Sequence, residues 1–176
     1  MKLAPEGWPP VLFALGASAR FGAQVAQGLG LELAAHEERE FEDGEHKART
    51  LVPVAGRAAY VIHALHGDAA HSANDKLCRM LFFIASLRDA GAASVTAVAP
   101  YLAYARKDRR TKPFDPVITR YVAALFQSAG ASAMMTIDVH NRAAYENAFT
   151  CRTGHIEAAP LFVAHLAPPR CARCGR

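Results

Sequence analysis

The chain has 176 residues, of which 52% are hydrophobic and 20% are charged, and its formal net charge is +4. This hydrophobic content excludes an intrinsically disordered chain, because disorder requires low hydrophobicity and high net charge. No apolar run reaches the roughly 18 residues that a membrane-spanning helix needs, and the proline-rich N-terminus does not fit a secretory signal. We therefore expect one soluble, cytoplasmic domain with no membrane partner.

The first third of the chain predicts strands connected by one helix and one polar turn. Val11–Leu15 is a short apolar strand, and Ser18 is placed to cap the next helix. The apolar face of that helix is expected to contain Phe21, Val25 and Leu29. The following segments expected to be extended are Leu33–Phe41, Thr50–Val54 and Tyr60–Leu65.

Helices and strands alternate in the rest of the chain. A helix follows Asn74, Gly91 ends it, and Cys78 within its apolar run is expected to be buried. The remaining elements are a strand over Ser94–Pro100, a helix opened by Asp115 and Pro116, and a strand over Ala133–Val139. This alternation predicts an α/β domain with a mostly parallel sheet flanked by helices. Residues 167–176 have no such periodicity and are expected to form a disordered tail.

The most strongly charged segment directly follows the strand Ser94–Pro100. Within seven positions it contains the cations Arg106, Lys107, Arg109, Arg110 and Lys112, together with Asp108. Ligands of open α/β sheets bind beyond the carboxyl ends of strands, and arginine can hold phosphate oxygens through two parallel N–H bonds. The segment is therefore a candidate polyphosphate site. The alternatives are a solvated basic loop and a nucleic-acid contact, which would also need a wider basic face with stacking aromatic residues.

An aspartate–histidine pair and an acidic turn are further candidate binding residues. Asp138 and His140 end the last predicted strand, and alternation along an extended chain would direct both side chains to one side. Together they could hold a divalent cation such as Mg²⁺ directly or through its water shell, and a structural Asp–His hydrogen bond is the alternative. The second cluster, residues 41–45, is an acidic turn after an exposed aromatic, which alone is typical of an ordinary hairpin.

These clusters occur in the order of a known set of motifs. Tyr104–Arg109 has the pattern Y-A-R-x-D-R, Thr136–His140 the pattern T-x-D-x-H, Phe41–Glu45 the pattern F-x-D-G-E, and Asn74–Leu77 the pattern N-D-x-L. Taken jointly, they resemble the ribose-phosphate pyrophosphokinase (PRPP synthetase) family over about residues 11 to 162. The resemblance implies the phosphoribosyltransferase-like N-terminal domain of that family.

The resemblance also implies roles for individual residues. Arg106, Lys107 and Asp108 would lie at the phosphates of ATP, and Asp138 and His140 at Mg²⁺. The turn residues Phe41, Asp43 and Glu45 would contact the adenine held by a neighbouring subunit, which implies a homo-oligomer. The family reaction transfers the β,γ-diphosphoryl group of ATP to the 1-hydroxyl of ribose 5-phosphate and releases AMP.

The sequence departs from the family in two respects. The second α/β domain, which holds ribose 5-phosphate and brings a catalytic lysine, has no counterpart here, so we expect an ATP-side domain over residues 1–166 and a tail over 167–176. Lys107 also stands where a glutamine is common. Three hypotheses follow: an incomplete enzyme, a non-catalytic regulatory subunit of a full-length synthetase, and a nucleic-acid binder.

Overall fold

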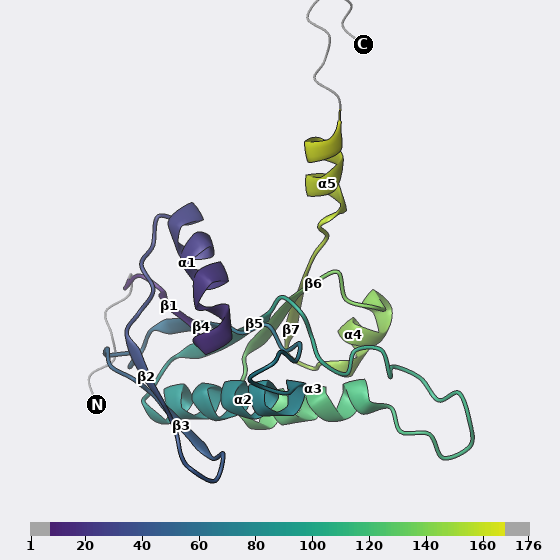
Figure 1. The fold of residues 1–176 in the computed structure, drawn as a ribbon, viewed down its shortest axis with the longest axis horizontal. Helices are drawn as coiled ribbons and strands as arrows, with labels where there is room; N and C mark the ends of the chain where they lie inside the picture. Colours follow the sequence, from purple (N-terminus) through teal and green to yellow (C-terminus); the bar gives the residue numbers. More distant parts are fainter. Residues whose placement is uncertain (1–7, 168–176) are drawn as a thin grey trace, which may run out of the picture.

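A five-stranded parallel sheet forms the centre of residues 8–167, the part of the chain that the computed structural model describes (Figure 1). The strands lie in the order β1-β4-β5-β6-β7, and each neighbouring pair is parallel. In that order their bounds are Val11–Ala14, Ala58–Ile62, Ser94–Ala99, Ala133–Ile137 and Arg152–Ile156. The expected α/β fold with a mostly parallel sheet is confirmed.

Helices cover both faces of this sheet, which is why strands β1, β4 and β5 are largely buried, whereas the edge strand β7 is mostly polar and only partly buried. Helix α1 lies on one face, and α2 and α3 lie on the other (Figure 1). Their bounds are Ala19–Gly28, Ala73–Asp89 and Ile118–Ser128. The main core fills the space between the sheet and the α2–α3 layer, where Val61, Ala97, Met80, Ile84 and Phe126 are fully buried. Burial of each large side chain stabilises the fold by about 1.5–3 kcal/mol.

Helix α2 begins at a capping box and buries two cations. The Ser72 side chain accepts a hydrogen bond from the Asp75 N–H, and the Asp75 carboxylate accepts one from the Ser72 N–H. Lys76 and Arg79 on the same helix are only 1% and 9% exposed. Cys78 is exposed, so the expectation of a buried thiol is wrong. It lies between the buried positions on either side, and its own side chain faces outward.

An antiparallel hairpin of β2 (His36–Glu40) and β3 (His46–Thr50) extends from one end of the sheet (Figure 1). Gly44 adopts a φ of +86° in its turn, a conformation that glycine accepts without strain. The strand expected over Thr50–Val54 is wrong. Strand pairing begins directly after the turn, and a hydrogen bond from Thr50 Oγ1 to the Val52 carbonyl closes a bend where that strand was expected.

The predicted apolar face of α1 borders an open groove instead of a closed core. Phe21 and Leu29 are 40% and 63% exposed, and with Val25 they line a groove of about 500 Å³ over the sheet. Helix α1 approaches the sheet closely at Gly22, where an added Cβ would lie 2.2 Å from the Ala14 Cβ.

The region after β6 contains three elements that the sequence did not predict, namely α4 (Arg142–Ala148), β7 and α5 (Ala159–Leu166). Helix α5 projects from the end of β7 (Figure 1), and its apolar side chains are more than half exposed. Helix α3 begins at Ile118, after its N-cap Val117, and not at Pro116. The expected disordered tail, apart from residue 167, lies outside the described residues. Within the described range, no helix has the length and apolar character needed to cross a membrane.

Candidate functional site

The carboxyl ends of β5 and β6 lie side by side, because the two strands are parallel and pair directly from Thr96 to Ala99 with Ala133 to Thr136. The chain leaves β5 into a long loop and leaves β6 into a short turn. Between loop and turn lies a cavity of about 210 Å³, lined by Tyr101, Leu102, Ala105, Arg106, Ile137, Asp138, Val139 and His140. The structure therefore brings three of the candidate residues, Arg106, Asp138 and His140, around one cavity.

Asp138 occupies an unusual backbone conformation at this cavity. Its φ is +43°, in the left-handed region, which costs a non-glycine residue of order 1–3 kcal/mol and is found mainly at functional sites. The Ile156 carbonyl accepts the Asp138 N–H, and Asp138 Oδ1 accepts the Ala158 N–H at 3.1 Å. Asp138 Oδ2 makes no hydrogen bond or ion pair to the described residues.

The strand expected over Ala133–Val139 therefore ends earlier, at Ile137. The left-handed turn at Asp138 breaks the alternation on which the expected common side of Asp138 and His140 depended. Both residues nevertheless line the same cavity, because the turn and not the pleat directs them there.

Lys107 lies in the same loop but is engaged elsewhere. Its Nζ is 2.6 Å from Asp115 Oδ2, and this carboxylate oxygen also accepts hydrogen bonds from Thr111 Oγ1 and from the N–H groups of Thr111 and Lys112. The pKa of Asp115 is held well below its ordinary value, mainly by the hydrogen bond from Lys107 and to a smaller extent by those from Thr111. Lys107 thus fixes the shape of the loop and does not line the cavity.

Asp108 joins the two segments that border the cavity. Its Oδ2 accepts a 2.7 Å hydrogen bond from Asn141 Nδ2, and Asn141 Oδ1 caps α4 by accepting the Ala144 N–H. Sequence reasoning missed Asn141 and Asp115 as parts of the site. A signal for Asn141 existed, since asparagine is a preferred helix N-cap.

A further contact ties the loop to α2. The Tyr104 hydroxyl donates a hydrogen bond to Asn74 Oδ1, and Tyr104 itself has a φ of +63°. Asn74 lies in the first turn of α2, in the N-D-x-L segment. Two of the sequence motifs that are distant along the chain are thus in direct contact.

The hairpin residues lie apart from this cavity within one chain. Phe41, Asp43 and Glu45 border a separate, open depression at the tip of the β2–β3 hairpin, and this depression shares no lining residue with the cavity. Figure 1 shows the hairpin at the end of the sheet away from the β5–α3 loop. Phe41 is 40% exposed, and the Arg39 guanidinium lies over its ring, 5.0 Å from the centroid.

The side chains at the cavity could supply only part of the coordination shell of Mg²⁺, with substrate phosphates and water as the other ligands. In the described part of the chain, no group of three His, Cys, Asp or Glu side chains is placed to hold a metal. Mg²⁺ is commonly held by one or two carboxylates, with waters and substrate phosphates completing its shell. The free Oδ2 of Asp138 and the exposed imidazole of His140 suit that partial role.

The family described as the N-terminal domain of ribose phosphate pyrophosphokinase matches residues 10–130. The chain belongs to this ribose-phosphate pyrophosphokinase family. The match includes the hairpin and the basic loop, and it ends before Asp138 and His140.

Individual relatives agree with this assignment. Ribose-phosphate pyrophosphokinase 1 of Streptococcus pneumoniae is 32% identical over 150 residues, which are 85% of this chain and 45% of the relative. The Ureaplasma parvum enzyme is 36% identical over 131 residues, which are 74% of this chain and 38% of that one. The crystal structure of phosphoribosylpyrophosphate synthetase from Mycobacterium smegmatis superposes with a TM-score of 0.83 at 29% identity, covering 90% of this chain and 52% of that one. The chain thus spans about half the length of the relatives it matches.

Proposed function

We propose that this chain binds MgATP at the cavity between β5 and β6, as the ATP half of a ribose-phosphate diphosphokinase site, with residues 1–166 forming the ATP-side domain. The observation that carries the proposal is the convergence of Arg106, Asp138 and His140 on one cavity. A guanidinium beside two potential magnesium ligands suits a polyphosphate, whose charge needs both kinds of partner.

Each residue has a distinct proposed role. Arg106 would hold phosphate oxygens, and Asp138 and His140 would hold the metal ion directly or through its waters. Magnesium, when bound, would offset the charge that develops as the diphosphoryl group leaves. Asp108 would act through Asn141 by fixing the loop. Lys107 would reach the phosphates only by exchanging its ion pair with Asp115.

The adenine contacts would come from a second copy of the chain. Phe41 is exposed at a hairpin tip, and Asp43 and Glu45 lie beside it, away from the cavity of their own chain. This arrangement supports a homo-oligomer in which the hairpin of one copy completes the ATP site of another.

The full reaction would transfer the diphosphoryl group of ATP to ribose 5-phosphate. We assign the described residues to ATP alone, and we place the ribose 5-phosphate site on a second domain like that of the longer relatives. The 176-residue chain alone should therefore release no AMP from MgATP when ribose 5-phosphate is added. AMP release that depends on ribose 5-phosphate would contradict this assignment.

Equilibrium binding tests the ATP half directly. Calorimetric titration of the chain with MgATP should give saturable binding, and Arg106→Ala should weaken it about 10-fold or more, since a hydrogen bond to a charged group contributes about 1.5–3 kcal/mol. Arg20→Ala is the matched control, because it removes an equal charge from the exposed start of α1. Equal affinities in the two variants would remove Arg106 from the site.

A further inference from the structure

A second polar cavity lies at the carboxyl ends of β1 and β4. Its volume is about 220 Å³, and its lining includes Glu38, Glu40, His63, His71, Lys76 and Arg79. None of the residues that line it also lines the cavity between β5 and β6. The site proposed above for MgATP uses none of these six side chains.

Three of the hydrogen-bond donors at this cavity are almost fully buried. His63, Lys76 and Arg79 are 2%, 1% and 9% exposed, although lysine and arginine are rarely buried unless paired. Each cation has one carboxylate partner: Lys76 Nζ lies 2.6 Å from Asp68 Oδ2, and Arg79 Nη2 lies 3.1 Å from Glu40 Oε2. A guanidinium has five N–H donors and an ammonium has three, so each partner satisfies only part of its cation.

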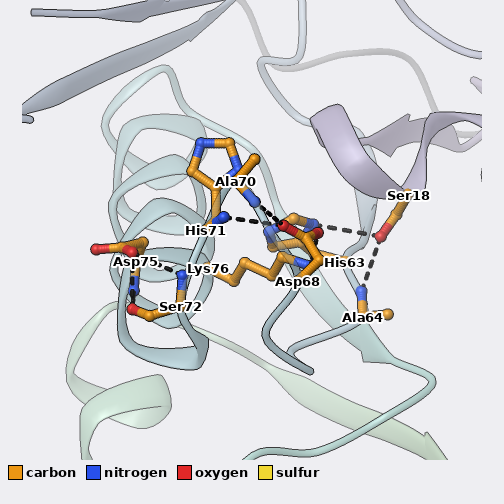
Figure 2. Close-up of polar contacts among 9 residues, drawn as sticks. All are labelled: Ser18, His63, Ala64, Asp68, Ala70, His71, Ser72, Asp75 and Lys76. Carbon is orange, nitrogen blue, oxygen red and sulfur yellow. Dashed lines mark hydrogen bonds and ion pairs between the residues drawn. The ribbon is translucent and has the colours of Figure 1, made fainter.

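His63 has a buried ring nitrogen without a hydrogen-bond partner among the described residues. Ser18 Oγ accepts the Ala64 N–H at 2.9 Å and lies 3.3 Å from His63 Nδ1 (Figure 2). In the tautomer in which the Ser18 hydroxyl donates its hydrogen to Nδ1, the imidazole proton lies on Nε2. Burial lowers the pKa of His63 to about 4, so the ring is neutral at pH 7 and Nε2 is a donor in this tautomer. Nε2 is buried and has no partner in the structure.

The second carboxylate that lines this cavity, that of Glu38, is engaged through one of its oxygens and does not pair with His63. Glu38 Oε1 accepts the Gly16 N–H at 2.7 Å and lies 3.0 Å from His36 Nε2. Neither Glu38 oxygen forms a hydrogen bond with His63 Nε2. An unpaired buried donor costs about 1–3 kcal/mol, and that cost disappears when an acceptor enters the cavity.

We propose that this cavity binds a small oxyanion of the phosphate type, held by His63 Nε2–H, Lys76 Nζ and the Arg79 guanidinium. Its volume admits a tetrahedral oxyanion with accompanying water, since each water molecule takes about 30 Å³ in the liquid. Its position beyond the ends of parallel strands is the usual one for ligands of open α/β sheets. Figure 2 shows His63, Asp68 and the Lys76 side chain gathered between α2 and the segment that follows β4.

Glu40 is the carboxylate that the oxyanion must displace. Its Oε2 lies 3.1 Å from Arg79 and 3.5 Å from His71, but its side chain is 53% exposed. An exposed carboxylate holds its partner weakly, whereas an oxyanion can engage a guanidinium through two parallel bonds. Glu40 is also the last residue of β2, directly before Phe41. Its displacement would remove a contact that holds the hairpin against α2.

Titration with inorganic phosphate, followed through the ring ¹⁵N signals of His63 by NMR at constant ionic strength, tests this proposal. Phosphate should shift these signals saturably. Glu40→Gln should tighten binding several-fold, because the competing charge is lost and the side-chain shape is kept. Arg79→Met should weaken binding about 10-fold or more, and Arg20→Met, which removes an exposed charge from α1, should leave the affinity unchanged.

Two results would overturn the proposal. One is a response that chloride reproduces at the same ionic strength or that does not saturate. The other is an affinity that Glu40→Gln leaves unchanged. Because Glu40 is an exposed side chain, its substitution keeps the test decisive even when Arg79→Met does not fold.

Discussion

Asn141 donates a 2.7 Å hydrogen bond to Asp108, and this single contact connects the basic loop after β5 to the turn after β6. The same asparagine caps α4 through its other side-chain atom. Two segments more than 30 residues apart are thereby held on either side of the cavity that Arg106, Asp138 and His140 line. The shape of the proposed MgATP site therefore depends on a residue that is not itself expected to touch the nucleotide.

Asn141→Asp separates the two roles of this residue. Aspartate caps helices as well as asparagine does, so the free energy of unfolding should change little from loss of the cap. The new carboxylate cannot donate to Asp108 and repels it, so the loop should shift and MgATP affinity should fall about 10-fold. Asn141→Ala should lower both quantities, with about 0.5–2 kcal/mol lost from the cap. Chemical denaturation and calorimetry measure the two effects. Wild-type MgATP affinity in Asn141→Asp would contradict this role.

Asp138→Asn should reveal whether this residue acts through magnesium. The amide keeps the size of the side chain and its acceptor for the Ala158 N–H, but it removes the charge that favours the metal. Affinity for MgATP should fall, while affinity for ATP in EDTA should stay equal or rise, because a negative charge near the phosphates is lost. An equal loss with and without magnesium would show that Asp138 only supports the turn.

The buried His63 predicts a specific pH dependence of stability. Its pKa is lowered to about 4 in the folded protein, against about 6.5 in an unfolded chain, so the unfolded state binds the extra proton between these values. Stability should therefore fall as pH drops from about 6.5 towards 4, with a total loss of order 3 kcal/mol from this residue. His63→Phe should flatten the profile in this window. Denaturant unfolding in phosphate-free buffer measures it, and equal slopes in both proteins would contradict a buried neutral His63.

Substitutions of two glycines in α1 test how closely this helix packs on the sheet. Gly22→Ala places a Cβ 2.2 Å from that of Ala14, so α1 must move from the sheet at a cost of about 1–3 kcal/mol. Gly28→Ala meets no atom within 4 Å and should stabilise the helix by about 0.5–1 kcal/mol. The shift of each variant's denaturant unfolding midpoint from that of the wild type measures these two effects. Similar effects of the two substitutions would mean that α1 is not packed closely on β1.

The sequence predicted the parts of the fold that depend on local patterns. The strands near Val11, Ser94 and Ala133 are continuous apolar runs, and the helix after Asn74 combines a cap, helical spacing and a terminal glycine. The strand that follows the hairpin turn was misplaced because β3 is mostly polar and is stabilised by pairing with β2, not by burial. Cys78 was misassigned because its apolar neighbours are interrupted by Lys76 and Arg79, which occupy buried positions.

The features of the site that the sequence did not predict depend on contacts between residues that are far apart in the chain or on loop backbone conformation. The sequence placed Arg106, Asp138 and His140 at the ends of two predicted strands, and the structure shows that these strands are neighbours and that the three residues line one cavity. The pairing of Lys107 with Asp115 could not be read from spacing. It depends on a loop whose residues Tyr104 and Phe114 adopt positive φ angles. The orphan Nε2 of His63 depends on contacts between β4 and the segment that contains Ser18, 45 residues earlier.

The measurement that tests the central claim most directly is a backbone ¹H–¹⁵N NMR titration of the chain with MgATP. The account predicts saturable shifts that are largest in residues 102–110 and 138–141, the loop and the turn that supply most of the residues lining the cavity between β5 and β6. In a self-associated sample, a second set of shifts is predicted at residues 41–45. The absence of saturable shifts in those two cavity segments, with changes confined to other parts of the sheet or spread evenly over the basic surface, would contradict an ATP site at this cavity.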